Sequence, residues 1–417
     1  MVGEHEGTSP LVLLWTFLHE PSKHMNQTTR SPIKPDTLAM IERLIGFDTT
    51  SRGSNLGLIE WTRDYLKGFG MESRLTYDAS GRKANLFATV QKGAKPGIVL
   101  SGHTDVVPVD GQNWASDPFK ATVKGDRLYG RGACDMKSYL AVILAMAPRF
   151  AAANLKAPIH FALSYDEEVG CIGARGLLED LARNNIRPAG AIIGEPTSMQ
   201  PVIAHKGRRG YTCCVRGKEA HSALTPQGVN AIEYAARIIT YIRHMAERLQ
   251  ACEPRDYGFD VPFTTLQTGV ISGGTASNIV PSECTFQFEF RCLPGADPDA
   301  LEREIRDYAE RVILPEMRRT DPGTSISIEG KSDSPGLSMG EEDELTHLAQ
   351  ALSRNPSTAK VAYVTEGGLF QQAGIPAIIC GPGSIEQAHK PDEYVTLAQV
   401  ALCESFMERL LEQMCAG

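Results

Sequence analysis

Histidine and carboxylate side chains, which bind metal ions and transfer protons, are concentrated in a few short segments of this sequence. Three segments directly follow short apolar runs, and they contain His103, Asp105, Glu167, Glu168 and Glu195. Two further polar segments carry Asp135, just before an apolar helical stretch, and His389, near the C-terminal end. Open α/β sheets place their ligand sites at the carboxyl ends of strands, so the residues that follow the apolar runs are candidates for one metal site.

His103 is more informative with its neighbour than alone. A single histidine at the end of an apolar run is more often an ordinary buried residue than a metal ligand. Asp105 lies two residues further on, and alternate residues of an extended segment share a face. Its carboxylate can therefore accept the ring N–H of His103 while the other ring nitrogen binds a metal ion. Asp135, taken by itself, is as consistent with a turn or a helix cap as with a metal ligand.

Glu167 and Glu168 are adjacent acids, and most such pairs lie in a solvated turn. Here they directly follow an apolar run, and successive side chains of an extended segment point in different directions. One carboxylate can then bind a metal ion while its neighbour acts as a base toward the attacking water. Glu195 and His389 are also compatible with ordinary loop positions, so neither is informative alone.

Short apolar runs alternate with amphipathic stretches from about residue 33 onward. This pattern predicts an α/β fold with a mixed, largely parallel sheet flanked by helices, in a catalytic domain made of residues 33–206 and 330–417. The predicted strands are residues 85–90, 98–100, 159–165, 191–193, 361–364 and 377–380. The predicted helices, which carry apolar residues at intervals of three and four, are residues 139–152, 174–184, 342–353 and 395–413.

The middle of the chain has a different order of elements. The pattern predicts strands at residues 211–216, 264–271, 284–291 and 325–328, and helices at 230–249 and 298–313. This β-α-β-β-α-β order is that of an inserted α+β ferredoxin-like domain, at residues 207–329. Asp297 and Pro298 supply a cap and a first-turn proline for its second helix. One face of that helix is formed by Leu301, Ile305, Tyr308 and Val312.

Composition and charge restrict the function classes. The 417 residues include 42 Lys and Arg against 50 Asp and Glu, a net charge of −8, which argues against a broad surface for nucleic acid or anionic membranes. The apolar stretch at residues 11–18 is too short to span a bilayer, and residues 1–32 are interpreted as an N-terminal tail. The ten cysteines show no disulfide or metal-ribbon spacing, so we expect reduced thiols in a cytoplasmic protein.

Two nucleotide-binding motifs are not matched. Arg131 and Met136 occupy positions where a phosphate-binding loop needs glycines ahead of Lys137 and Ser138. No early strand is followed by the GxGxxG of dinucleotide-binding folds, which disfavours a dinucleotide-dependent oxidoreductase.

Together the polar segments resemble the dinuclear zinc amidohydrolase family, which includes acetylornithine deacetylase, succinyl-diaminopimelate desuccinylase, aminoacylase and bacterial carboxypeptidases. The resemblance covers nearly the whole chain after the tail and rests on residues 101–108, 130–137, 166–170, 194–197 and His389. Residues 130–137, 170–175 and 365–370 are most similar to the acetylornithine deacetylase branch. Ser138 and Gly367 depart from that branch, which commonly has glycine and alanine there.

The resemblance implies two bound divalent metal ions, zinc or, as the alternative, cobalt. The implied ligands are His103 and Glu195 for one ion, Glu168 and His389 for the other, and Asp135 as a bridge. Glu167 would be the general base, and Asp105 would orient His103. A bridging carboxylate suits ions about 3.5–4 Å apart, and imidazole and carboxylate ligands suit zinc.

The resemblance also implies functional residues in the inserted domain, which would serve as lid and homodimer interface. His221 would donate a hydrogen bond to the oxyanion of the tetrahedral intermediate in the partner's site. Asn278 and Arg291 would bind the carboxylate of the substrate. A capping histidine, a turn amide and a solvated strand-end charge are the structural alternatives for these residues.

The activity implied by the resemblance is hydrolysis of an N-acyl amino acid, most closely N-acetyl-L-ornithine, to acetate and the free amino acid in arginine biosynthesis. Another deacylase, a dipeptidase or a carboxypeptidase on the same metal core is the alternative within the enzyme class. A catalytically silent binding protein is the alternative from another class, disfavoured because every implied ligand and the base are present.

Overall fold

The computed structural model describes residues 33–91 and 95–415, which form two compact units. The first unit contains the described residues up to Ala204, together with Leu337–Ala359 and those from Thr365 onward. The second contains His205–Gly336 and Lys360–Val364, and the inserted domain predicted at residues 207–329 falls within it. The predicted tail, residues 1–32, lies outside the described residues.

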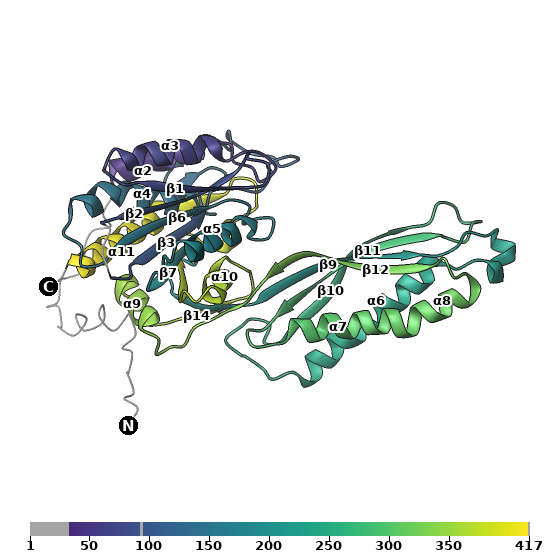
Figure 1. Cartoon of the computed structure of the whole chain (residues 1–417). Helices are drawn as coiled ribbons and strands as arrows, with labels where there is room; N and C mark the ends of the chain where they lie inside the picture. The colour runs from purple at the N-terminus through teal and green to yellow at the C-terminus, as the bar shows by residue number, and fades with distance from the viewer. Residues whose placement is uncertain (1–32, 92–94, 416–417) are drawn as a thin grey trace, which may run out of the picture. The chain divides into compact units, whose positions relative to one another are not determined.

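The first unit is built on a nine-stranded mixed sheet (Figure 1). Its strands, in sheet order, are β1 (Ser73–Tyr77), β2 (Ala84–Val90), β6 (Ile159–Ser164), β3 (Ile98–His103), β7 (Gly190–Pro196), β15 (Ala377–Gly381), β8 (Val202–His205) and β13 (Leu337–Ser338), with β14 (Ala359–Val361) paired to β8. The central strands β6, β3, β7 and β15 run parallel. β1, β2 and β8 pair antiparallel, so the sheet is parallel where it is most enclosed.

Helices flank this sheet. They are α2 (Pro35–Ile45), α3 (Leu56–Lys67), α4 (Lys137–Ala152), α5 (Ile172–Arg183), α9 (Glu344–Ser353), α10 (Gly367–Gln372) and α11 (Leu397–Cys415), with the short 3-10 helix η3 (Ile385–Gln387). A small sheet adds β4 (Thr122–Lys124), β5 (Arg127–Tyr129) and β16 (Tyr394–Thr396). The first two turns of α4 are buried all round because the helix packs against α2, α11 and the sheet. Among the described residues, no helix is long and apolar enough to cross a membrane.

One predicted strand of the catalytic domain was misplaced. The sequence predicted a strand at residues 361–364, whereas β14 covers Ala359–Val361 and the following residues bend away. The reason is the length of the partner strand, since β8 ends at His205 and the last pairing bond runs from the Lys206 N–H to the Val361 carbonyl. The apolar residues that follow therefore have no strand edge beside them.

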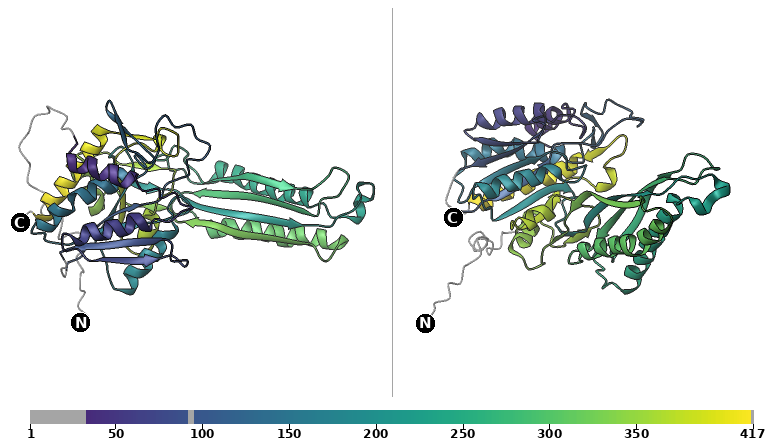
Figure 2. Two further views of the ribbon diagram at one scale, coloured as in Figure 1. Left: turned by 90° about the horizontal axis from the view of Figure 1, so that it is seen from above. Right: turned by 45° about the vertical axis from the view of Figure 1, so that its right-hand side comes forward.

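The second unit is a four-stranded antiparallel sheet with helices along one face (Figure 2). Its elements are β9 (Gly207–Arg216), the 3-10 helix η1 (Ser222–Gln227), α6 (Ala231–Cys252), β10 (Thr265–Gly273), β11 (Glu283–Cys292), α7 (Pro298–Tyr308), the π-turn η2 (Ala309–Ile313), α8 (Leu314–Thr320) and β12 (Ser325–Ser334). The sheet order β10-β11-β9-β12 and the β-α-β-β-α-β chain order agree with the predicted ferredoxin-like arrangement. Alternate side chains of β11, such as Phe286 and Phe290, pack against α6 in its core.

The second helix of this unit runs further than predicted. Asp297 caps it, since its carboxylate accepts the Ala300 N–H at 3.0 Å, as expected. The helix does not stop at Ile313 but continues through the π-turn η2 into α8. A π-turn adds one residue and shifts the register, so Ile313 is buried in the place predicted for Val312, which is 43% exposed.

Candidate functional site

Three neighbouring parallel strands of the first unit bring together His103, Glu167 and Glu195, three of the residues that the sequence predicted for the site. His103 is the last residue of β3, Glu167 follows the end of β6, and Glu195 is near the end of β7. Because β6 pairs with β3 and β3 with β7, all parallel, these carboxyl ends meet at one edge of the sheet. Nε2 of His103 lies 3.8 Å from Oε1 of Glu195.

Asp135 lies between two imidazole rings. Its Oδ1 is 2.9 Å from Nε2 of His103, and its Oδ2 is 3.3 Å from Nε2 of His389. The same Nε2 of His389 lies 2.9 Å from Oε2 of Glu168. Since the two oxygens of one carboxylate face two different rings, Asp135 has the arrangement of a bridge between two cation positions.

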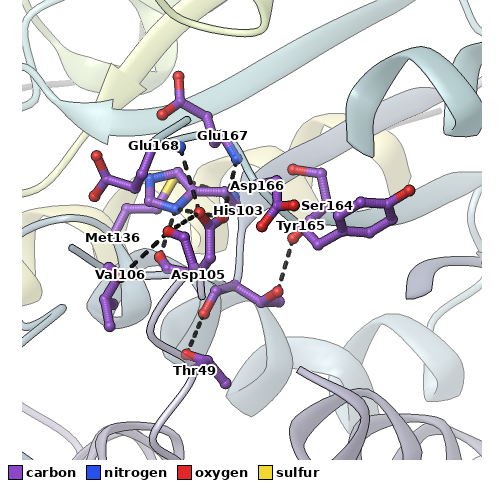
Figure 3. Close-up of polar contacts among 12 residues, drawn as sticks. Thr49, His103, Asp105, Val106, Met136, Ser164, Tyr165, Asp166, Glu167 and Glu168 are labelled. Atoms are coloured by element: carbon purple, nitrogen blue, oxygen red, sulfur yellow. Dashed lines mark hydrogen bonds and ion pairs between the residues drawn. The ribbon is translucent and has the colours of Figure 1, made fainter. Parts of the chain in front are cut away.

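The contact between Asp105 and His103 differs from the predicted one. Nδ1 of His103 is 2.8 Å from the main-chain oxygen of Asp105, whereas the carboxylate oxygen is 3.6 Å away. The ring of His103 therefore meets the main-chain carbonyl group of Asp105 rather than its carboxylate. The carboxylate accepts hydrogen bonds from the main-chain N–H groups of Glu167 and Glu168 at 3.0 and 3.3 Å (Figure 3). It also accepts the hydroxyl of Ser51 at 2.7 Å.

Carboxylates are crowded at this edge of the sheet. Ligand atoms of His103, Glu167 and Glu195 lie within 4.8 Å of one another, and so do those of His103, Asp135 and Glu168. Burial, assisted by the neighbouring carboxylates, raises the pKa of Glu167 to about 8 and the pKa of Glu168 to about 7. Burial also raises the pKa of Glu195 well above its usual range. Added positive charge would therefore stabilise the ionised cluster.

The carboxylates of the cluster in turn raise the pKa values of the two imidazoles. Burial by itself would lower the pKa of His103, but its contacts with Asp105 and Asp135 outweigh burial and raise the pKa well above its usual range. Hydrogen bonds with Asp135 and Glu168 raise the pKa of His389 to about 10. A metal ion binds neutral imidazole, so metal binding at these rings must release protons.

The residues present fit divalent metal ions. Oε1 of Glu195 is buried and has no hydrogen-bond partner among the residues that the structure describes. Leaving a buried carboxylate oxygen without a partner costs free energy, and a cation would remove that cost. Imidazole nitrogen and carboxylate oxygen are donors that suit zinc.

The other three predicted residues belong to the second unit. His221 caps η1, since its Nδ1 accepts the Ala223 N–H at 3.1 Å, and its side chain is exposed. Asn278 is exposed in the neighbouring loop, where its main-chain oxygen accepts the Ser222 N–H at 3.0 Å. Nε of Arg291 donates to Oε1 of Glu289 at 3.1 Å. The predicted roles of these residues in catalysis and substrate binding stay predictions.

Two buried glutamates beside the cluster were not predicted. Glu366 accepts hydrogen bonds from the hydroxyls of Ser101 and Ser164, which lie at the ends of β3 and β6. Glu393 accepts the main-chain N–H groups of Cys134 and Asp135. Glu366 lies in the segment of residues 365–370 that resembles the family and Glu393 does not, but neither acid has neighbours that signal its burial.

Comparison with known families and relatives supports a hydrolase. Residues 99–413 match peptidase family M20/M25/M40. The acetylornithine deacetylase of Myxococcus xanthus is 36% identical over 390 residues, which are 92% of this chain and 98% of the relative. The acetylornithine deacetylase of Pasteurella multocida is 32% identical over 391 residues, 92% of this chain and 99% of the relative.

Solved structures share the fold at lower identity. The M20 metallo-carboxypeptidase Sso-CP2 from Sulfolobus solfataricus has a TM-score of 0.72 at 18% identity, covering 91% of this chain and 99% of that one. The aminopeptidase PepT from Bacillus cereus has a TM-score of 0.71 at 21% identity, covering 92% and 99%. YxeP from Bacillus subtilis, described as a dinuclear metal-binding peptidase, has a TM-score of 0.62 at 16% identity, covering 90% and 96%. The chain is therefore a hydrolase and belongs to peptidase family M20/M25/M40.

Proposed function

We propose that the protein hydrolyses the amide bond of N-acetyl-L-ornithine, giving acetate and L-ornithine as a step of arginine biosynthesis in the cytoplasm. Support comes from the two acetylornithine deacetylases that are 32–36% identical over almost their whole length. Succinyl-diaminopimelate desuccinylase, aminoacylase or dipeptidase activity on the same site is the alternative. A catalytically silent binding protein fits less well, because the cluster retains all of its proposed ligands and its base.

The observation that carries the proposal is the position of Asp135 between His103 and His389, with one carboxylate oxygen toward each ring. We assign His103 and Glu195 to one divalent ion, Glu168 and His389 to the other, and Asp135 to both. Zinc is the proposed metal and cobalt the alternative. When bound, the ions would polarise the amide carbonyl and acidify a water molecule.

Glu167 is the proposed general base. It shares a cluster with His103 and Glu195, yet its neighbour Glu168 is the one that contacts His389. Its carboxylate would take a proton from the attacking water and return it to the nitrogen of the leaving amine. Asp105 holds this base in place, because its carboxylate accepts the main-chain N–H groups of Glu167 and Glu168.

The second unit would complete the site in a homodimer. In this proposal His221 donates a hydrogen bond to the oxyanion that forms on the amide carbonyl, from one copy into the site of the other. Asn278 and Arg291 bind the carboxylate of the amino acid, for which the planar guanidinium is suited. These assignments rest on the resemblance of the sequence to the family.

A panel of substrates tests the proposed function. The purified protein, loaded with zinc or with cobalt, is assayed with N-acetyl-L-ornithine, N-succinyl-diaminopimelate, N-acetylmethionine and simple dipeptides. We expect the highest kcat/KM for N-acetyl-L-ornithine. A higher value for another member of the panel would reassign the substrate, and hydrolysis of none of them would favour the binding-protein alternative.

A further inference from the structure

A buried ion pair lies behind the cluster. Nη1 of Arg131 is 2.6 Å from Oε2 of Glu393, and each side chain is only 1% exposed. The pair joins segments 262 residues apart in the sequence. Removing two charges from water costs free energy that their attraction does not always recover, so a buried pair of this kind is weak evidence for a role in stability alone.

Glu393 holds the segment that carries Asp135. Its Oε1 accepts the main-chain N–H of Cys134 at 2.8 Å and that of Asp135 at 3.0 Å. Its main-chain oxygen accepts the Gly130 N–H at 3.0 Å. The backbone on either side of Arg131 is thereby tied to one glutamate.

Arg131 and Gln112 also form hydrogen bonds with the segment that carries His389. Nη2 of Arg131 donates to Oε1 of Gln112 at 2.6 Å, and Nε2 of Gln112 donates to the main-chain oxygen of His389 at 3.0 Å. Nη1 of Arg131 also donates to the main-chain oxygen of Lys390 at 3.3 Å. Gln112 and Arg131 therefore contact both segments at once.

The His389 segment needs such contacts because His389, Lys390 and Pro391 are exposed and packing holds them little. The side chain of His389 is 53% exposed. His389 and Asp392 both have left-handed backbone conformations, with φ of 64° and 54°, which non-glycine residues rarely adopt. A second hydrogen bond, from the Ala115 N–H to Oδ1 of Asp392 at 2.9 Å, joins this segment to the one that contains Gln112.

We propose that Arg131, Glu393 and Gln112 form a positioning network that sets the distance between Asp135 and His389, and thereby the affinity of the metal position that His389 completes. The inference rests on the proposed function, in which these two residues are ligands. His103 and Glu195 lie on β3 and β7 of the sheet and do not depend on the network for their placement. The metal position that they form should therefore be less sensitive to changes in it.

Metal titration tests the network without any substrate. Zinc is added to the metal-free protein in competition with a chromophoric chelator, and two dissociation constants are fitted. The variants are Glu393→Gln, which keeps the size of the side chain but removes the ion pair, and Gln112→Met, which removes only the hydrogen bonds of a partly exposed residue. Glu404→Gln is the matched control, because Glu404 is another buried glutamate that accepts a main-chain N–H, from Lys34.

We expect Glu393→Gln to weaken the lower-affinity step roughly 10–100-fold, the usual effect of removing a group that supports a metal ligand. Gln112→Met should weaken the same step about 3–10-fold, as the loss of its two hydrogen bonds within the network, to Arg131 and His389, implies. The higher-affinity step should change less than twofold in Gln112→Met and less than the lower-affinity step in Glu393→Gln, because Asp135 is assigned to both ions, and the control should change neither step. Circular dichroism and thermal unfolding of the metal-free proteins establish that each variant is folded.

Unchanged affinities in folded variants, or equal weakening of both steps, would overturn the network while leaving the proposed function intact. If Glu393→Gln fails to fold, Gln112→Met decides alone. Two ions bound normally by an unaltered protein that hydrolyses no N-acyl amino acid would instead count against the proposed function. Fewer than two ions bound by the unaltered protein would overturn both.

Discussion

Oδ1 of Asp105 accepts the main-chain N–H of Glu167 at 3.0 Å. An acid that follows β3 therefore holds the proposed base, which follows the neighbouring strand β6. The same carboxylate accepts the hydroxyl of Ser51 and the N–H of Glu168. The two carboxylate oxygens together accept these three hydrogen bonds. The carboxylate of Asp105 is thus placed to position the proposed base, while its main-chain oxygen contacts His103.

Asp105→Asn should lower kcat about 10–100-fold while both metal ions stay bound. The amide has a single acceptor oxygen, and its N–H₂ group would face N–H or O–H donors in place of the second oxygen. Steady-state kinetics and elemental analysis of the same sample are the measurements. Asp126→Asn, an exposed aspartate in the turn between β4 and β5, is the control. Wild-type kcat in Asp105→Asn would contradict the assignment.

Asp135→Ala should lose metal ions and activity together, because the carboxylate that faces both imidazoles is removed. Elemental analysis after dialysis measures the metal content, and N-acetyl-L-ornithine hydrolysis measures the activity. We expect fewer than two ions per chain. A variant that keeps its full metal content and its turnover would remove Asp135 from the bridging position.

Glu167→Gln and Glu168→Gln form a matched pair of neighbouring variants. The first should keep both ions but lower kcat about 10²–10⁴-fold, because an amide cannot accept the proton of the attacking water. The second should weaken metal binding, since Glu168 contacts His389. Kinetics and metal titration are compared for both. An empty site in Glu167→Gln with a loaded, inactive Glu168→Gln would mean that the two roles are exchanged.

His221→Ala should lower kcat strongly and leave metal content and fold unchanged, because the proposed oxyanion contact forms in the transition state. Its control is His244→Ala, another exposed histidine of the second unit. If His221 acts on the site of a second copy, mixing His221→Ala with Glu167→Gln should restore part of the activity. Subunit exchange is first confirmed by fluorescence. Exchange without recovery would exclude this arrangement, and full activity of His221→Ala alone would exclude His221 from catalysis.

Stability should decrease with acidification between about pH 6.5 and pH 4, partly through His160. Burial lowers the pKa of His160 to about 4, so the folded protein binds its proton less readily than the unfolded chain, whose pKa is near 6.5. Its contribution is complete above pH 6.5 and is lost as the pH falls toward 4. The loss between pH 7.5 and pH 5 is about 2 kcal/mol.

Urea unfolding at pH 7.5 and pH 5 measures this loss, and His160→Phe tests its origin. Phenylalanine keeps a ring stacked on Phe87 but cannot be protonated. The difference in unfolding free energy between the two pH values should shrink by about 2 kcal/mol in the variant. An unchanged difference would place the pH dependence in other groups.

Much of this protein follows from its sequence alone. The apolar runs that end in His103, Glu167 and Glu195 are local signals, because a buried parallel strand needs continuous apolar residues and its carboxyl end is where polar side chains emerge. The order of elements in the second unit and the cap at Asp297 are also local signals, since each is set by residues close together in the sequence. Such features depend on neighbouring residues, so their pattern is visible along the chain.

Contacts between distant segments were decided only by the tertiary structure. Glu393 meets the N–H of Asp135 across 258 residues of sequence, and nothing near Glu393 signals its burial. Asp105 bonds to the main-chain N–H groups of Glu167 and Glu168 because β3 and β6 lie side by side in the sheet, which residue spacing does not encode. Ile313 rather than Val312 is buried in the core because the π-turn η2 shifts the register of the helix. Each outcome depends on backbone geometry that forms only when separate segments pack together.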